Sequence, residues 1–275
     1  MTGNSYSEKC IMLQQLMQTY SKGNVMVAFS GGVDSSLLLK MAVVYAGGQG
    51  KKVYAVTADT ELHALQDIRI AKQTARELGA DHIVLRLQEL GQAGIRNNPV
   101  DRCYRCKKYL FGRIKEKAEE LEALTVLEGT NADDMLVYRP GIKAVEELDI
   151  KSPLKEAGFT KEEVRRLAKE YGISAADRPS APCLATRFPY GESLDKEKLA
   201  RVEQGEQFLR SMGFYNVRLR IHGEIARIEV DDTDMDKLLE NRKDIIKHLK
   251  ALGYRYITMD LEGFRSGSMD IHINK

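Results

Sequence analysis

The sequence predicts an α/β fold with a parallel, doubly wound sheet, followed by a smaller α/β domain. Short apolar runs typical of buried strands alternate with longer amphipathic runs typical of helices, which implies parallel strands joined by right-handed crossovers. The run 25–29 ends in Ser30-Gly31-Gly32 and then becomes helical, which indicates a strand, a tight turn and a helix N-terminus. Ligands of such sheets lie beyond the carboxyl ends of the strands, so functional residues are expected there.

Periodicity and stop signals define the elements of the first domain. Strands are expected at 25–29, 52–58, 82–85 and 124–127, and helices at 7–20, from about 34, at 67–78 and at 109–121. Gly79 ends the third of these helices. Thr160 and Glu163 form a capping box that starts a further helix, and Cys10 is expected to be a small core residue.

The pattern changes near residue 190. A helix is expected at 193–212, strands at 216–221 and 225–230, a helix at 234–252 and a last strand at 256–260. We therefore predict two domains, 1–190 and 191–275, without a flexible linker.

Composition limits the class of protein. The 275 residues carry 42 Lys and Arg against 40 Asp and Glu, so the net charge of +2 argues against a nucleic-acid substrate. No apolar stretch reaches the roughly 18 residues of a membrane span, and the N-terminus lacks the apolar core of a signal peptide. We expect a cytoplasmic protein. Its four cysteines then suit metal ligands or redox groups better than a disulfide scaffold.

The turn after the first strand has the features of a phosphate site. Gly31 and Gly32 allow positive φ and close approach of a ligand, while the helix beginning near Asp34 presents N–H groups to phosphate oxygens. Further hydroxyl donors are Ser30, Ser35 and Ser36. A Ser-Gly-Gly sequence alone is as often a plain turn, but its place between a strand and a helix favours a nucleotide site.

Two other strand ends extend this site. Thr57, Ala58 and Asp59 lie at the end of the second strand, where an adenine or ribose could rest. The fourth strand leads into 128–134, Glu-Gly-Thr-Asn-Ala-Asp-Asp, whose Asn and Asp oxygens suit Mg²⁺ on a triphosphate. A capped turn would use the same residues, so the metal interpretation depends on the neighbouring phosphate loop.

Three cysteines form a second candidate centre. Cys103 and Cys106 make a C-x-x-C pair, and Cys183 lies 77 positions beyond Cys106 (183 − 106). Three thiolates with an open fourth position suit a cluster or a catalytic metal, whereas structural zinc has four ligands. An iron–sulfur cluster, zinc and a redox disulfide all stay open on these residues alone.

Arg218 and Arg220 alternate along a predicted strand and therefore share one face. Two guanidinium groups there could bind a phosphate or a carboxylate. Alternate arginines on a strand are, however, more often a solvent-exposed face.

The loop 30–35 resembles the Ser-Gly-Gly-x-Asp-Ser motif of the PP-loop ATP pyrophosphatases, which transfer AMP to an oxygen of the acceptor. The segment 153–168 is similar to a Pro-Leu…Lys-x-Glu-Val-Arg-x-Leu-Ala helix in members that amidate or thiolate their substrates. Three further segments resemble the LarE family: Tyr-Arg-Pro-Gly at 138–141, Arg-Phe-Pro-Tyr-Gly at 187–191 after Cys183, and 217–229. This similarity spans nearly the whole chain, including 263–267.

The resemblance implies an ATP-dependent sulfur transferase that makes the nickel-pincer nucleotide cofactor of lactate racemase. Its substrate would be pyridinium-3,5-biscarboxylic acid mononucleotide, whose carboxylates are adenylated and become thiocarboxylates. The expected ATP contacts are Ala28, Ser30, Gly31, Gly32, Asp34, Ser35, Ser36, Thr57, Gly129 and Asn131, with Mg²⁺ on Asp34 and Asp134. The expected substrate contacts are Arg187, Glu206, Arg218, Arg220 and Glu229, with Arg218 and Arg220 on the phosphate.

The cysteines distinguish two branches of the LarE family. In one branch a single cysteine, which matches Cys183, gives up its own sulfur and becomes dehydroalanine. In the other, three cysteines hold a [4Fe-4S] cluster that carries an extra sulfide for donation. Because Cys103 and Cys106 accompany Cys183, the sequence resembles the second branch, and these three residues and Asp34 are the expected catalytic set. The family commonly forms trimer-based assemblies, so a homotrimer or hexamer is expected, with other cofactor-biosynthesis proteins as further partners.

Two alternatives stay open. A tRNA thiolation enzyme of the PP-loop superfamily could use the same loop and three cysteines, but it should have a basic surface and salt-sensitive RNA binding. A nucleotide-binding regulatory module with structural zinc would bind ATP without releasing pyrophosphate.

Overall fold

The computed structural model describes residues 4–136, 139–178, 183–265 and 267–269. The chain divides into two compact units. The first unit comprises Met1–Ala93 and Cys103–Ala181, and the second unit comprises Gly94–Arg102 and Pro182–Lys275. The predicted boundary near residue 190 gave no indication of the short segment 94–102, and the functional division into two domains stays a prediction.

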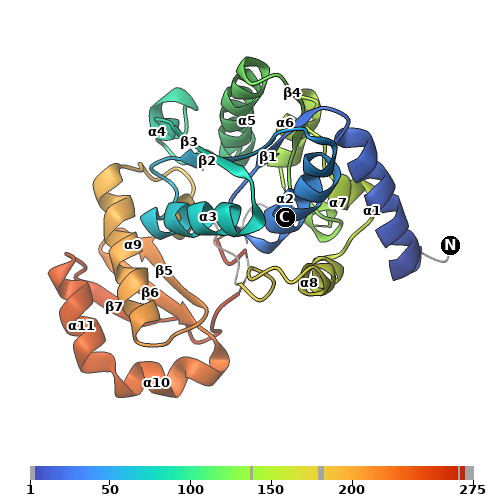
Figure 1. Cartoon of the computed structure of the whole chain (residues 1–275). Helices are drawn as coiled ribbons and strands as arrows, with labels where there is room; N and C mark the ends of the chain where they lie inside the picture. The colour runs from blue at the N-terminus through green and yellow to red at the C-terminus, as the bar shows by residue number, and fades with distance from the viewer. Residues whose placement is uncertain (1–3, 137–138, 179–182, 266, 270–275) are drawn as a thin grey trace. The chain divides into compact units, whose positions relative to one another are not determined.

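The first unit contains a four-stranded parallel sheet of order β3-β2-β1-β4 (Figure 1). Its strands are β1 (Asn24–Ala28), β2 (Val53–Asp59), β3 (Asp81–Arg86) and β4 (Ala123–Leu127). The central pair aligns Val25 with Val53, and all three neighbouring pairs are parallel. Central parallel strands are buried on both faces, which is why their sequences show continuous apolar runs. The predicted doubly wound sheet is confirmed.

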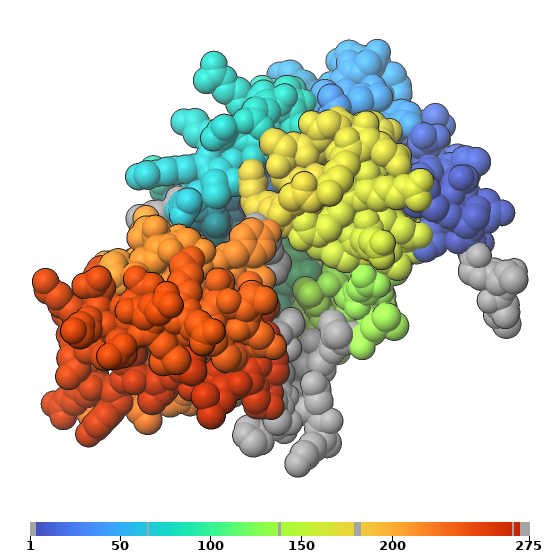
Figure 2. All heavy atoms as spheres, turned by 90° about the horizontal axis from the view of Figure 1, so that it is seen from below, coloured from blue at the N-terminus to red at the C-terminus, as the bar shows by residue number. Residues whose placement is uncertain are grey.

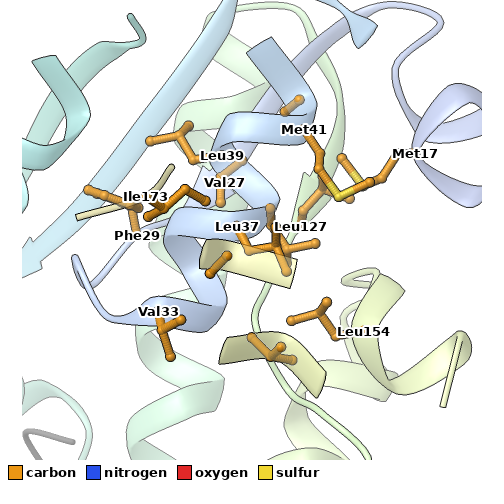
Figure 3. Close-up of a cluster of buried hydrophobic side chains, with 14 of the residues drawn as sticks. Met17, Val27, Phe29, Val33, Leu37, Leu39, Met41, Leu127, Leu154 and Ile173 are labelled. Carbon is orange, nitrogen blue, oxygen red and sulfur yellow. The ribbon is translucent and has the colours of Figure 1, made fainter. Parts of the chain in front are cut away.

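Helices cover both faces of this sheet. The helices of the first unit are α1 (Tyr6–Tyr20), α2 (Val33–Tyr45), α3 (Leu65–Leu78), α4 (Glu89–Gln92), α5 (Arg102–Glu120), α6 (Gly141–Glu147), α7 (Pro153–Glu156) and α8 (Lys161–Glu170), with 3-10 turns η1 (Gly47–Gln49) and η2 (Asp133–Met135). One core joins β1, β2 and β4 to α1, α2, α3, α7 and α8, and Figure 3 shows Met17, Leu37 and Leu154 converging in it. A second core places α5 and α6 on the other face.

Helix α8 starts at the predicted capping box. The Thr160 hydroxyl accepts from the backbone N of Glu163, and the Glu163 carboxylate accepts from the backbone N of Thr160. At the surface, α8 adjoins α1, where Lys9 Nζ and Glu163 Oε2 form a 2.8 Å ion pair; Figure 2 shows the yellow and blue segments meeting there. Cys10 of α1 is half-buried against the core, as expected for a small packing residue.

Two predicted helices differ from the structure. Helix α5 begins at Arg102, seven residues before the predicted start at Tyr109. The prediction missed residues 102–108 because they lack the apolar stripe that marks an amphipathic helix. They contain no residue that breaks a helix, so α5 continues through them. The single helix expected at 234–252 is two helices, α10 (Met235–Glu240) and α11 (Arg242–Ala251). Between them, the Asn241 amide donates to the carbonyl of Lys237 at 2.8 Å and so competes with the helical hydrogen bonds.

The second unit is a smaller α/β layer. Its sheet has the order β5-β6-β7, from β5 (Val217–His222), β6 (Ile225–Val230) and β7 (Tyr256–Met259), with β5 and β6 antiparallel and β6 and β7 parallel. Helix α9 (Lys196–Ser211) packs against β5 and α11 (Figure 1). The 3-10 turns η3 (Leu184–Arg187) and η4 (Asp232–Asp234) complete the unit.

The segment 94–102 is held in the second unit by Asn98, which is fully buried. Its amide donates to the carbonyl oxygens of Phe188 at 3.1 Å and Pro189 at 2.7 Å. Its own carbonyl accepts from Gly191 N at 3.0 Å. Asn98 adopts φ of 46°, a left-handed conformation that asparagine tolerates better than most residues.

Candidate functional site

The phosphate loop joins β1 to α2. Gly31 has φ of 73°, and a Cβ at this position would lie 3.1 Å from Ala71 Cα, so both its conformation and its space require glycine. Gly32 caps α2 without a side-chain hydrogen bond, which leaves the first N–H groups of a 13-residue helix available to an anion. Ser35 Oγ donates to Gly32 O at 3.2 Å and lies 3.3 Å from Ser30 Oγ, so the serines hold the loop in shape.

Asp34, in the first turn of α2, joins the phosphate loop to the end of β4. Its Oδ1 accepts from Asn131 Nδ2 at 3.1 Å, and its Oδ2 forms an ion pair with Lys161 Nζ. Gly129 packs directly beneath it, because a Cβ there would lie 3.0 Å from Asp34 Cβ and 3.2 Å from Ser35 N. The first unit therefore brings the residues predicted at the ends of β1 and β4 together.

Replacing Gly129 with Ala is expected to displace the start of α2 and to weaken ATP binding about tenfold, the scale of one overpacked methyl group. Titration calorimetry with a non-cleavable ATP analogue would measure the change. Gly112→Ala is a matched control, because a Cβ there meets nothing within 4 Å. Equal affinity in the Gly129 variant would show that this contact does not shape the nucleotide site.

Asn131 also organises the acidic turn after β4. Its Oδ1 accepts from the backbone N of Asp133 at 3.0 Å and of Asp134 at 3.3 Å, and its own N donates to Asp134 Oδ2 at 3.1 Å. The other oxygen of Asp134 pairs with Arg139 Nη2 at 2.7 Å. The two predicted Mg²⁺ ligands, Asp34 and Asp134, thus share one buried asparagine.

Thr57 lies two residues before the end of β2 and belongs to a buried hydrogen-bond chain. Its hydroxyl donates to the carbonyl of Phe29, one residue before the loop, at 2.7 Å. Because that proton is committed, His82 Nε2, at 2.8 Å, donates to Thr57 Oγ1. Burial, with a contribution from Lys72, lowers the pKa of His82, which favours a neutral ring. Sequence reasoning missed His82; its only signal was its place on the neighbouring strand.

Two basic residues of the loop region were also missed. Arg178 Nη1 donates to the carbonyl of Gly31, and Lys161 carries the ion pair with Asp34. Both lie more than a hundred positions beyond the loop, so nothing in the local pattern connects them to it.

The three cysteines are divided between the units. Cys103 is exposed and Cys106 half-buried on the first turns of α5, where residues three apart share one face. Cys183 is half-buried in the second unit and precedes η3; its carbonyl accepts from Thr186 Oγ1 at 2.9 Å and from Arg187 Nη1 at 3.1 Å. Within each unit, the described residues include no group of three His, Cys, Asp or Glu side chains arranged around a metal position.

The five predicted substrate contacts lie in a buried charge cluster of the second unit. Arg187 donates to both oxygens of Glu206 at 2.8 and 2.9 Å, and Arg210 adds a third bond at 2.6 Å. Burial alone would raise the pKa of Glu206, but the charges and hydrogen bonds of these arginines hold it below its ordinary value.

The arginines of β5 complete the charge cluster. Arg220 Nε donates to Glu229 Oε2 at 3.0 Å, and the Arg218 guanidinium lies 5.0 Å from the Phe264 ring centroid. Burial, with repulsion from Arg187, lowers the pKa of Arg218 to about 10. Each arginine is only 5% exposed, so the expectation of a solvent-exposed face is wrong: helix α9 and η3 cover β5.

Several known proteins are similar in sequence to this chain. A family model described as asparagine synthase matches residues 15–97. The pyridinium-3,5-bisthiocarboxylic acid mononucleotide synthase of Lactiplantibacillus plantarum is 40% identical over 251 residues, which are 91% of this chain and 90% of that protein. An uncharacterized protein of Synechocystis is 34% identical over 96% of this chain and 98% of its own length. The tRNA-specific 2-thiouridylase MnmA of Rickettsia felis is 28% identical over 67% of this chain and 60% of its own length.

Proposed function

Because the chain belongs to the family of pyridinium-3,5-bisthiocarboxylic acid mononucleotide synthases, the LarE family, we propose that it is an ATP-dependent sulfur transferase. In this proposal it adenylates the carboxylates of pyridinium-3,5-biscarboxylic acid mononucleotide and converts them to thiocarboxylates. The observation that carries the proposal is 40% identity to a synthase of that name over nine-tenths of both chains. Membership in the PP-loop family implies ATP and Mg²⁺ as co-substrate and cofactor.

The residues of the first unit support the adenylation step. A carboxylate is a poor electrophile, and transfer of AMP from ATP to its oxygen creates a good leaving group while pyrophosphate departs. The N–H groups at the start of α2 would bind the departing pyrophosphate. Asp34 and Asp134 would hold Mg²⁺, with Asn131 fixing both carboxylates relative to each other.

Substrate binding is assigned to the charge cluster of the second unit. Arg218 and Arg220 are proposed to bind the phosphate of the mononucleotide. Glu229 would hold Arg220 in place through its ion pair, while Arg187 and Glu206 form a second ion pair in the same charge cluster. The neighbouring arginines repel the charge of Arg218, and a bound phosphate would offset this repulsion.

Sulfur donation is assigned to Cys103, Cys106 and Cys183 as ligands of a [4Fe-4S] cluster. The donor chemistry fits, because three thiolates are the ligands such clusters use and the C-x-x-C pair shares one helix face. When bound, the cluster would supply a sulfide that replaces AMP at the activated carbonyl carbon. The chain would retain its cysteines through this step, unlike a sacrificial donor.

The first experiment on this proposal combines product and metal analysis on protein handled without oxygen. The protein is incubated with Mg²⁺, ATP and the biscarboxylate mononucleotide. We expect pyrophosphate release that requires this substrate, a thiocarboxylate product detected by mass spectrometry, and about four iron atoms per chain. Cys183→Ala should lose iron and product, while Cys10→Ala, at a half-buried packing position, should retain both.

Other outcomes identify different functions. Pyrophosphate release stimulated by tRNA and suppressed by salt would favour tRNA thiolation. ATP binding without pyrophosphate release, together with inert zinc, would indicate a regulatory module. Product formation without iron would make Cys183 a sacrificial donor.

The same proposal includes the assembly and location of the protein. We propose a homotrimer or hexamer in the cytoplasm that works with other cofactor-biosynthesis proteins.

A further inference from the structure

Lys161 connects the start of α8 to the phosphate loop. Its backbone N donates to Asp133 Oδ2 at 2.8 Å, and its side chain reaches the carboxylate of Asp34. The capping box on Thr160 fixes the same helix end, so the Cα of Lys161 is anchored on both sides. Its side chain is 35% exposed, which leaves the ammonium group room to move.

Both oxygens of each predicted Mg²⁺ ligand already have partners. Asp34 uses Oδ1 for Asn131 and Oδ2 for Lys161. Asp134 uses Oδ1 for Arg139 and Oδ2 for the backbone N of Asn131. In each carboxylate one partner is therefore a cation. A cationic side chain repels a divalent metal on the same oxygen. The side chain must therefore be displaced before the metal binds.

We propose that Lys161 is a placeholder cation of the phosphate loop. It neutralises Asp34 in the nucleotide-free protein and moves to the β- and γ-phosphates when Mg²⁺ and ATP arrive together, which releases the Asp34 carboxylate to the metal. This inference rests on the proposed function. Lysine suits the exchange, because its ammonium is a point charge on a flexible stem and can donate to changing partners.

The neighbouring Arg178 has a different role. Its guanidinium donates to the carbonyl of Gly31 and so supports the loop backbone without neutralising a metal ligand. Of Lys161 and Arg178, only Lys161 contacts an oxygen of a proposed Mg²⁺ ligand. Free Mg²⁺ should consequently bind poorly without nucleotide, and the triphosphate should supply the negative charge that draws Lys161 away.

Opposite effects of one substitution test this exchange. In Lys161→Met, Mn²⁺ should bind the nucleotide-free protein roughly fivefold more tightly, the upper range for a partly exposed ion pair. The same variant should bind a non-cleavable ATP analogue with Mn²⁺ at least about tenfold more weakly, because one phosphate contact is lost. Electron paramagnetic resonance of free Mn²⁺ and titration calorimetry supply the two readouts.

Controls separate this role from a structural one. Lys169→Met changes the same helix at its other end, where Lys169 Nζ pairs with Asp177 at 2.8 Å, and should alter neither affinity. In an Asp34→Asn background, Lys161→Met should no longer improve Mn²⁺ binding, because the competing carboxylate is gone. If Lys161 only stabilised the fold, both affinities would fall together.

The results also distinguish this inference from the proposed function. Wild-type protein that binds no analogue with Mn²⁺ would refute the ATP-dependent function itself. Wild-type binding with an unchanged or weaker Mn²⁺ affinity in Lys161→Met would overturn only the placeholder role.

Discussion

Replacing Asp34 with Ala is expected to lower the rate of substrate-dependent pyrophosphate release at least about a hundredfold. The substitution removes the carboxylate that joins Asn131 to Lys161 and that would hold Mg²⁺ beside the phosphate loop. Its partners among the described residues include none of the cysteines, so the iron content should stay at the wild-type value. A pyrophosphate assay and iron analysis on one preparation measure both effects.

Asp81→Ala provides the matched control for Asp34. Asp81 is the exposed first residue of β3, at the opposite end of the strand from the carboxyl ends where the nucleotide is expected. Its removal should leave the fold intact, as judged by thermal melting. Unchanged pyrophosphate release in Asp34→Ala would refute the metal-binding role of this residue and, with it, the proposed geometry of adenylation.

Replacing Glu206 with Gln is expected to lower the free energy of unfolding by about 3–5 kcal/mol. Glu206 is 1% exposed and accepts from Arg187, Arg210 and the backbone N of Leu219. The neutral amide cannot compensate the buried Arg187 charge, which would be left without its principal counter-ion. Denaturant unfolding, followed by circular dichroism, measures the loss.

Glu197→Gln is the matched control on the same helix. Glu197 is 82% exposed and pairs with Arg201 at 3.5 Å, so its substitution should change stability by less than about 1 kcal/mol. A comparable loss in both variants would show that the charge cluster is not the source of the effect.

The charge cluster also predicts a direction of pH dependence. The pKa of Glu206 is lower in the folded protein than its ordinary value of 4.5. The contribution of this carboxylate to stability is therefore present above pH 4.5 and is lost as the pH falls through the folded-state pKa. Glu206→Gln should remove that part of the acid sensitivity.

The parallel sheet and the phosphate loop could be predicted because their signals are local. Continuous apolar runs such as 25–29 identify buried strands, and Gly31 is required by both backbone conformation and space. Thr160 and Glu163 likewise reveal a helix start within four residues. In each case the signal lies in a few consecutive residues.

Residues brought to a site by the fold could not be predicted in this way. Lys161 contacts Asp34 across 127 positions, and Arg178 contacts Gly31 across 147. Their side chains carry no local sign of these partners. The burial of Arg218 and Arg220 was equally hidden, because it depends on Glu206, Glu229 and the elements that cover β5.

The course of the chain between the two units affects how the protein can be synthesised. Segment 94–102 leaves the ribosome early, but Asn98 needs carbonyl groups that lie 90 and 91 positions further on. The second unit therefore cannot close around this segment while the nascent chain is short. A translation product that stops near residue 180 would expose Asn98 without its partners, which makes it a natural target for quality-control proteases.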